Sequence, residues 1–261
     1  MAKVALIGAG SVVFSKQLTY DILSYPEMKD SLIALHDIDP VRLDTAEKVA
    51  TKLVEKLGSH AKVEATLDRK EALKDADYVI VMVQVGMHEA TLIDFKIPEK
   101  YGLKQTIADS YDVGGVFRFL RSFPFYQGLV EDMALVCPDA YLLNYTNPMP
   151  MNMLSVFRLN PDIKAVGLCH SVQGTAGMLA NILDVPYEEL EYKVAGLNHQ
   201  AFFLALKHQG QDLYPKLREL VADPEKVKDK KDKYDWMTRW DAVRVELFRR
   251  LGYYITESSE H

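Results

Sequence analysis

Short apolar runs alternate with segments of helical spacing along the first two thirds of the chain. The runs are rich in Val, Ile, Leu and Ala, which is typical of strands buried on both faces of a parallel sheet. They are Lys3–Ile7, Leu32–Leu35, Lys62–Thr66, Tyr78–Val83, Tyr141–Tyr145 and Ala165–Leu168. Apolar residues recur at helical spacing in Gln17–Ser24, Val41–Leu57, Arg69–Ala76, Gly114–Met133 and Ser171–Leu183. Strands that alternate with helices predict βαβ units, and therefore an α/β fold built on a doubly wound parallel sheet.

The pattern changes in the last third of the chain. Tyr192–Leu206 alternates in part and is rich in Phe and Ala, which predicts one long strand of a second sheet, and Asp241–Leu251 is again helical. Asp223–Asp235 holds almost nothing apolar, which favours a solvated connection or an exposed helix end. We therefore expect a Rossmann-like domain over residues 1–170 and the start of a second, α+β domain over residues 171–261.

Composition limits the classes of protein that this fold could serve. Of the 261 residues, 48% are hydrophobic and 26% charged, which excludes a disordered chain. The net charge of −6 argues against nucleic acid as the main partner, and no apolar run is long enough to span a membrane. Two cysteines, Cys137 and Cys169, are too few for a disulfide scaffold. We expect a cytoplasmic protein that binds a small molecule.

A glycine-rich turn follows the first predicted strand. Gly8 permits a tight turn, Gly10 allows a close approach of a pyrophosphate, and the helix after Ser11 offers free N–H groups. Asp37 ends the second strand, where a dinucleotide-binding protein places the acid that binds the adenosine ribose. A carboxylate there repels a 2′-phosphate, so the pattern favours NAD over NADP. Gln84 follows the fourth strand at the same edge of the sheet, either as a cofactor contact or in an ordinary turn.

Polar residues also end two later strands and interrupt one apolar segment. These clusters are Asn144–Asn147, Cys169–His170 and Asn198–His199. A single buried cysteine or histidine is most often structural. Together, beside a nucleotide site, the three clusters favour a thiolate–imidazole metal site with a proton donor, which suggests Lewis-acid help in the oxidation of an alcohol.

These motifs resemble those of glycoside hydrolase family 4. The segments that carry the resemblance are Ile7-Gly8-Ala9-Gly10-Ser11, Asn144-Tyr145-Thr146-Asn147-Pro148-Met149, Cys169-His170-Ser171-Val172-Gln173-Gly174 and Gly196-Leu197-Asn198-His199. The Cys-His-Ser-Val form and the closing Thr256–His261 segment are similar to the melibiase-type α-galactosidase branch. The resemblance covers the whole chain. It implies an α-galactosidase that depends on NAD and a divalent metal, usually Mn²⁺, and that forms a homodimer or homotetramer.

The implied mechanism departs from the paired-carboxylate route of most glycosidases. NAD removes hydride from sugar carbon 3, which acidifies the proton on carbon 2. A base takes that proton, the leaving group is eliminated from carbon 1, water adds, and NADH returns the hydride. The metal would polarise the oxygens on carbons 2 and 3.

The resemblance also implies roles for individual residues. Cys169 and His199 match the metal ligands of the family. His170 stands where another branch has an aspartic acid that donates a proton, so we expect it to act as a general acid or to contact the leaving group.

Substrate contacts are expected on the same side of the fold. Asn147 matches a contact to a sugar hydroxyl, and Asp109 and Asp112 lie in a loop that we expect to face the pocket. The family's general base lies shortly beyond the last motif. Because the chain stops at His261, we expect its second domain to be cut short and the base to lie beyond it.

Three alternatives remain open at this point. The first is an α-galacturonidase of the same family, whose substrate differs from an α-galactoside only in the group on sugar carbon 6. The second is a non-catalytic NAD-binding fragment, which would also have the glycine turn at Gly8 and the acid Asp37. A 2-hydroxy-acid dehydrogenase of similar fold would use a substrate-binding arginine, for which Arg118 and Arg121 are candidates, but it has no place for the Cys169 motif.

Overall fold

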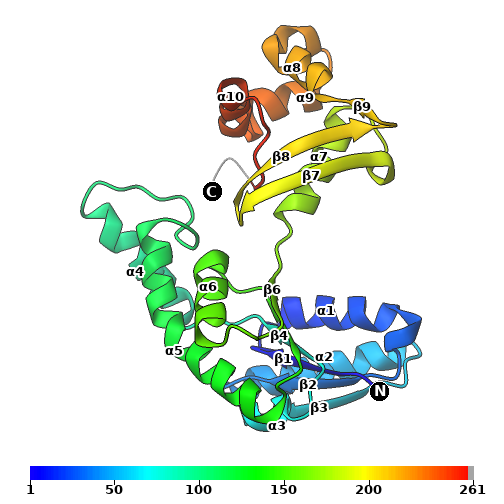
Figure 1. The fold of residues 1–261 in the computed structure, drawn as a ribbon, viewed down its shortest axis with the longest axis vertical. Helices are drawn as coiled ribbons and strands as arrows, with labels where there is room; N and C mark the ends of the chain where they lie inside the picture. The colour runs from blue at the N-terminus through cyan, green and yellow to red at the C-terminus, as the bar shows by residue number, and fades with distance from the viewer. Residues whose placement is uncertain (258–261) are drawn as a thin grey trace. The chain divides into compact units, whose positions relative to one another are not determined.

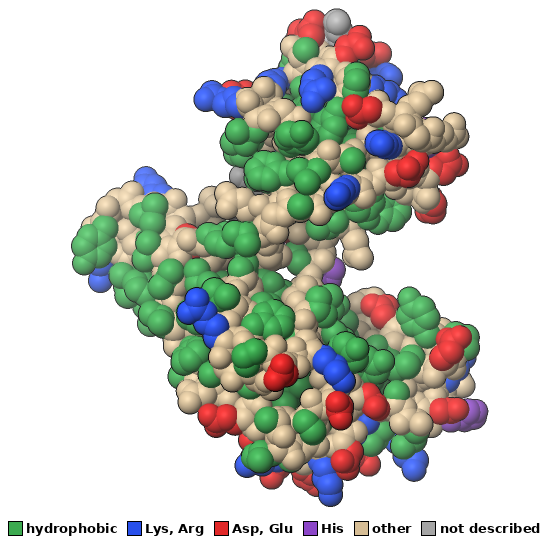
Figure 2. All heavy atoms as spheres, viewed as in Figure 1, with side chains coloured by type: hydrophobic (Ala, Val, Ile, Leu, Met, Phe, Trp, Pro, Cys, Tyr) green, Lys and Arg blue, Asp and Glu red, His purple; other side chains and the backbone are tan. Residues whose placement is uncertain are grey.

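The computed structural model describes residues 1–257, apart from the side chain of Lys226. The chain divides into two compact units, Met1–Leu168 and Cys169–His261, so Cys169 and His170 belong to the second unit. Among the described residues, no helix combines the length and the apolar character needed to cross a membrane. On the face drawn in Figure 2, acidic and basic side chains are interleaved, in keeping with 37 acidic and 31 basic residues.

The first unit is built on a parallel sheet of six strands in the order β3-β2-β1-β4-β5-β6 (Figure 1). The strands are β1 (Lys3–Ile7), β2 (Leu32–His36), β3 (Lys62–Thr66), β4 (Tyr78–Val81), β5 (Tyr141–Asn144) and β6 (Ala165–Gly167). The chain moves outward from β1 to β3, returns to pair β4 with β1, and moves outward again on the other side. This confirms the doubly wound prediction, and ligands bind such sheets at the carboxyl edge where the order reverses.

Helices cover both faces of this sheet because its strands are apolar on both faces. They are α1 (Val12–Ser24), α2 (Pro40–Lys56), α3 (Arg69–Leu73), α4 (Met87–Glu99), α5 (Val113–Val136) and α6 (Met149–Leu159), with a short 3₁₀ turn at Pro26–Met28. Val4 and Leu6 pack in a cluster with residues of α1 and α2. Ala5 and Ile7 pack in a cluster with residues of α3, α5 and α6. Successive side chains of one strand thus bind opposite helical layers.

The second unit has an antiparallel sheet in the order β7-β8-β9, with helices packed against it. Its elements are α7 (Ser171–Ile182), β7 (Leu190–Leu197), β8 (Gln200–His208), β9 (Gln211–Asp212), α8 (Tyr214–Ala222), α9 (Lys231–Asp235) and α10 (Ala242–Leu251), with shorter turns at Tyr187–Glu189, Pro224–Val227 and Trp236–Trp240. Phe203 and Phe248 are fully buried in its core. The hydrophobic centre of this unit is therefore separate from the two clusters of the parallel sheet.

The prediction of one long strand over Tyr192–Leu206 is wrong. The segment folds into a hairpin in which Leu197 pairs with Gln200, so that Asn198 and His199 form the turn. His199 has a φ of 62°, in the left-handed region that asparagine and glycine usually occupy at such turns. The apolar alternation runs through both strands, and without a glycine at the turn it shows no break.

Candidate functional site

A pocket of about 690 Å³ lies at the carboxyl edge of the parallel sheet, within the first unit. Its walls include Gly8, Ser11, Asp37, Gln84, Gly86 and Asn147. The volume is in the range of pockets that hold small molecules and cofactors. The glycine turn and Asp37 predict a dinucleotide at this edge, and the structure has a cavity there that both of them line.

The glycine turn at this pocket requires both of its glycines. Gly8 has a φ of 90°, and a Cβ there would lie 2.8 Å from the carbonyl oxygen of Met82. A Cβ on Gly10 would lie 2.6 Å from the Oδ2 atom of Asp37. The bare Gly10 therefore lets the carboxylate of Asp37 approach the turn, in addition to the close ligand approach expected from the sequence.

Asp37 is held at the pocket by main-chain donors. Its Oδ2 accepts a hydrogen bond of 2.8 Å from the N–H of Gly10, and its Oδ1 accepts one of 2.9 Å from the N–H of Asp39. A carboxylate oxygen has two lone pairs, so each oxygen keeps one for a further donor. The geometry fits a carboxylate that is oriented in advance to accept ribose hydroxyls.

The turn after β4 forms another wall of the pocket. The Nε2 of Gln84 donates to Oγ1 of Thr91 over 2.9 Å. Arg121 forms a two-pronged ion pair with the buried Asp94, at 3.0 and 2.5 Å, and its Nε donates to the carbonyl of Val85 over 3.0 Å. Arg121, a candidate substrate arginine under the dehydrogenase alternative, thus supports the pocket wall.

The three predicted substrate contacts have different surroundings. Asn147 lines the pocket, and its Nδ2 donates to Oδ2 of Asp109 over 3.0 Å. Asp112 caps α5, because its Oδ1 accepts the N–H of Gly115 over 2.5 Å. Burial, aided by the charge of Asp109 and opposed by the Gly115 N–H, raises the pKa of Asp112 above its usual range. Arg118 also lines the pocket and donates to the carbonyl of Asn147 over 3.2 Å.

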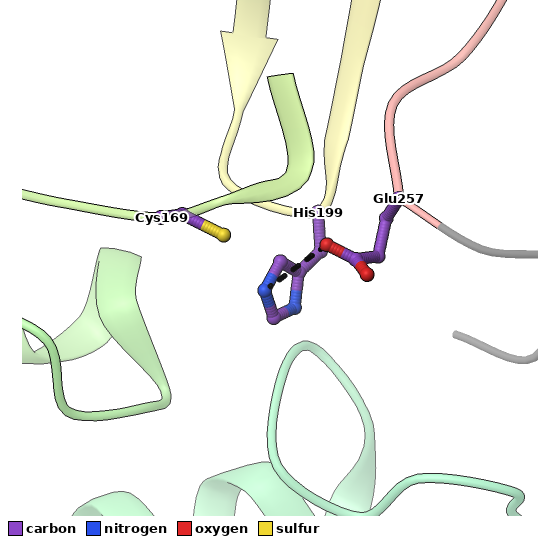
Figure 3. A group of neighbouring side chains, drawn as sticks. All are labelled: Cys169, His199 and Glu257. Atoms are coloured by element: carbon purple, nitrogen blue, oxygen red, sulfur yellow. Dashed lines mark ion pairs between the residues drawn. The ribbon is translucent and has the colours of Figure 1, made fainter. Parts of the chain in front are cut away.

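A sulfur, a nitrogen and an oxygen donor gather within the second unit. Cys169, His199 and Glu257 each offer one donor atom, and these atoms lie within 4.8 Å of one another. Figure 3 shows the three side chains converging from separate segments of the chain. The side chain of His199 is 6% exposed, and its Nε2 lies 3.6 Å from Oε2 of Glu257.

The thiol of Cys169 is activated by its neighbours. Burial raises its pKa, but interactions with His199, Ser171 and Asn198 outweigh burial and bring it down to about 7. The N–H of Ser171, at the start of α7, donates to Sγ over 3.5 Å. At Cys137, in contrast, burial raises the pKa to about 11. Only one of the two cysteines is therefore prepared to act as a thiolate near neutral pH.

This donor set suits a first-row transition-metal ion. Bonds of about 2.0–2.3 Å to such an ion place neighbouring ligands about 3 to 4 Å apart. The three donor atoms, which lie within 4.8 Å of one another, would move closer together around a bound ion. Thiolate and imidazole favour transition metals over Mg²⁺ or Ca²⁺, and a carboxylate suits Mn²⁺ as well.

Two further comparisons with the sequence analysis concern this group. His170 is exposed and occupies the N-cap position of α7, outside the three donors. Glu257 was not predicted, although the Thr256–His261 segment that contains it carried part of the family resemblance. Its place beside His199 depends on pairing between distant parts of the chain, which no local pattern reveals.

Models of protein families match almost the whole chain. Residues 3–185 match family 4 glycosyl hydrolase, and residues 194–261 match the C-terminal domain of the same family. An α-galactosidase of Bacillus subtilis (strain 168) is 41% identical over 100% of this chain, and one of Rhizobium meliloti (strain 1021) is 37% identical over 99%. The chain spans 58% and 51% of the lengths of these two relatives.

Solved structures share the fold across the whole chain. The Bacillus subtilis protein lplD, described as a glucosidase, superposes with a TM-score of 0.88 at 26% identity, covering 100% of this chain and 62% of that one. A 6-phospho-α-glucosidase from gut microorganisms, solved with NAD and Mn²⁺, has a TM-score of 0.79 at 20% identity, covering 98% and 58%. The resemblance found in the motifs is confirmed, and the chain belongs to glycosyl hydrolase family 4.

Proposed function

We propose that the chain carries the NAD-binding and metal-binding parts of an α-galactosidase that works by oxidation, elimination and addition of water. The observation that carries this proposal is the presence, in one chain, of a glycine-turn pocket with an oriented acid and a separate sulfur–nitrogen–oxygen donor group. Two relatives named α-galactosidase, at 41% and 37% identity, support the substrate class. The gut 6-phospho-α-glucosidase, solved with NAD and Mn²⁺, supports the choice of cofactors.

In this proposal the first unit binds NAD. Asp37 accepts the ribose hydroxyls, since its two oxygens are already aligned by backbone donors. The side chain of Ser11 does not cap the first turn of α1, and N–H groups of that turn are proposed to bind the pyrophosphate. Gln84 and Asn147 line the same pocket and are proposed to contact the cofactor and the sugar, respectively.

The second unit supplies the metal ligands Cys169 and His199. When bound, the metal polarises the oxygens on sugar carbons 2 and 3, and NAD accepts and returns the hydride. The thiolate of Cys169 contributes negative charge, and the N–H of Ser171 holds its sulfur in place. His170, exposed at the start of α7, is proposed to donate a proton to the leaving group, and Asp109 and Asp112 to assist sugar binding.

A thiolate ligand also bears on where the enzyme works. Cys169 is a free cysteine, as is Cys137, and a reducing compartment keeps such thiols available. We therefore propose a cytoplasmic enzyme. From the family resemblance we also propose that it assembles as a homodimer or homotetramer.

Hydrolysis of p-nitrophenyl α-galactoside tests the function directly. The chain is assayed with NAD, Mn²⁺ and a reductant, and in parallel without NAD or with a chelator. We expect release of nitrophenol that requires both NAD and Mn²⁺. Release in the absence of NAD would exclude the proposed mechanism. Preference for an α-galacturonide would favour the galacturonidase alternative. Binding of NAD without turnover would identify the chain as a non-catalytic part.

A further inference from the structure

We infer that Glu257 is a third protein ligand of the metal ion, so that the second unit holds a Cys–His–Glu site. The inference rests on the proposed function, because it takes Cys169 and His199 as metal ligands. It adds a residue that the motifs do not assign and that lies within 4.8 Å of both other donors.

Strand pairing fixes where Glu257 lies. Ile255 forms an antiparallel bridge with Phe202, at the start of β8. The N–H of Thr256 donates to the carbonyl of Ala201 over 2.8 Å, and the N–H of Ala201 donates to Oγ1 of Thr256 over 3.1 Å. The paired residues of β8 follow directly after the hairpin turn, and Glu257 follows directly after Thr256. The pairing therefore places Glu257 beside His199 in the turn.

A buried ion pair holds the same segment from behind. Arg244 and Asp241, both nearly inaccessible to solvent, form an ion pair of 2.6 Å. Arg244 also donates to the carbonyl of Ile255 over 3.4 Å and to Oγ1 of Thr175 on α7 over 2.9 Å. The hydroxyl of Tyr254 donates to Asp241. A buried polar network whose members are hydrogen-bonded to one another makes the segments that it joins more rigid.

This network connects two of the three donors. α7, which contains Thr175, begins two residues after Cys169, and the segment that contains Ile255 leads to Glu257. The thiol and the carboxylate are thus fixed to one buried centre, while the hairpin turn supplies the imidazole. His199 and Glu257 have φ values of 62° and 74°, which non-glycine residues adopt at some cost. Both ends of this pair are held in place by the surrounding fold, as is typical of a ligand site.

The charge of the donor set favours a bound cation. Because a cysteine binds a metal ion as the thiolate, a Cys–His–Glu set would present two negative ligands to the ion, with the three donor atoms already within 4.8 Å of one another. A divalent ion neutralises both. Mn²⁺ prefers oxygen ligands, so a carboxylate oxygen makes a site with a cysteine and a histidine more suitable for this ion. A carboxylate that only oriented His199 would give no such gain, and this difference can be measured.

The experiment titrates the chelator-stripped full chain with Co²⁺, a spectroscopic probe of this kind of site, and then with Mn²⁺. Thiolate ligation gives a near-ultraviolet charge-transfer band, and the visible bands of Co²⁺ report the number and kind of its ligands. We expect Glu257→Gln to lower the affinity for both ions at least about tenfold and to shift the visible bands. Glu257→Asp, which keeps the carboxylate, should restore part of the affinity.

A second histidine–glutamate pair in the same unit provides a matched control. Nε2 of His208 lies 2.7 Å from Oε2 of Glu189, and neither residue belongs to the Cys169–His199–Glu257 group. Glu189→Gln should leave metal affinity and spectra unchanged. Because thermal unfolding of every variant is measured without metal, a general loss of structure is distinguished from loss of a ligand.

The outcomes separate the inference from the proposed function. If Co²⁺ binds with a charge-transfer band that Cys169→Ser removes, but Glu257→Gln changes neither affinity nor visible bands, the inference is overturned and the Cys169–His199 site stands. Lower affinity with unshifted visible bands also overturns it, because Glu257 then only positions His199. If the wild-type chain shows no thiolate-bound Co²⁺, both the inference and the proposed metal site fail.

Discussion

The pocket of the first unit and the donor group of the second are built on different principles. At the pocket, backbone groups just after the ends of adjacent strands orient the polar side chain, because the N–H groups of Gly10 and Asp39 donate to the carboxylate of Asp37. In the donor group, three side chains from remote segments meet, and tertiary pairing places them. The first kind of site follows from the order of strands. The second exists only once the core around Phe203 and Tyr254 has formed.

The two cysteines show the same contrast for one residue type. Cys137 lies among apolar side chains of the parallel-sheet core, and its burial disfavours the thiolate. Cys169 is also partly buried, but donors near its sulfur reverse the effect. Burial alone therefore does not decide reactivity, and the polar neighbours of a cysteine have to be known.

The largest expected effect concerns these two thiols. In metal-free protein we expect far more thiolate at Cys169 than at Cys137 at pH 7, because their pKa values are about 7 and about 11. Alkylation of Cys169 by iodoacetamide should rise with pH through a midpoint near 7, because the deprotonated form reacts. Rates are measured on Cys137→Ser and Cys169→Ser, each of which leaves a single thiol. A midpoint for Cys169 above pH 8.5, the value of an ordinary thiol, would contradict the structure.

A smaller effect is expected at the nucleotide pocket. Asp37→Ala removes the acceptor of two backbone N–H groups and of the proposed ribose contacts. NAD affinity should fall about 10- to 50-fold, as loss of charged hydrogen bonds implies, and NADP affinity should fall less. Calorimetric titration with both nucleotides measures this. Asp68→Ala is the matched control, because Oδ1 of Asp68 also accepts the N–H two residues further along the chain, as Oδ1 of Asp37 does, but Asp68 lies outside the pocket walls.

If Asp68→Ala weakened NAD binding as much as Asp37→Ala, the loss would reflect general destabilisation. The expected result for Asp68→Ala is a loss of about 1 kcal/mol in stability, typical of a lost helix cap, with NAD affinity unchanged.

Much of the first unit was predictable from the apolar pattern. β1 and β3 have the predicted bounds, and the other strands agree within two residues of them. The helices α4 and α6 of the first unit, and α8 and α9 of the second, were not predicted. α4 shows why, since it exposes Leu92 and Ile93 to solvent and so lacks a clean division into apolar and polar faces.

The residues of the pocket were predictable from the sequence, while those of the donor group were predictable only in part. Gly8, Ser11, Asp37, Gln84 and Asn147 were all singled out from the sequence, and all line the pocket. In the second unit the sequence pointed to Cys169 and His199 as polar clusters in an apolar pattern and then through the family motifs, and Glu257 was missed. Its neighbour in space, His199, lies across a bridge between β8 and a later segment, and such pairing has no local signature.

The smallest expected effect tests whether a side chain behind the pocket wall matters to the ligand. Arg121 uses its two terminal nitrogens on Asp94 and its Nε on the carbonyl of Val85, so it fixes the turn after β4. Arg121→Lys keeps the charge beside Asp94 but cannot donate to both partners in this geometry. NAD affinity should fall about three- to fivefold, because the wall loses one fixed point.

The control for Arg121 is an arginine–aspartate pair in the same unit that supports no residue of the turn. Arg69 binds Asp132 at 2.6 Å and lies over the ring of Phe125, which lines the pocket, and a lysine at position 69 keeps a cation near that ring. Arg69→Lys should lower the unfolding temperature about as much as Arg121→Lys does, yet leave NAD affinity unchanged. Equal losses of NAD affinity in the two variants would show that the pocket depends on the stability of the whole unit. In that case the backbone framework described for the first unit would extend well beyond the strand ends.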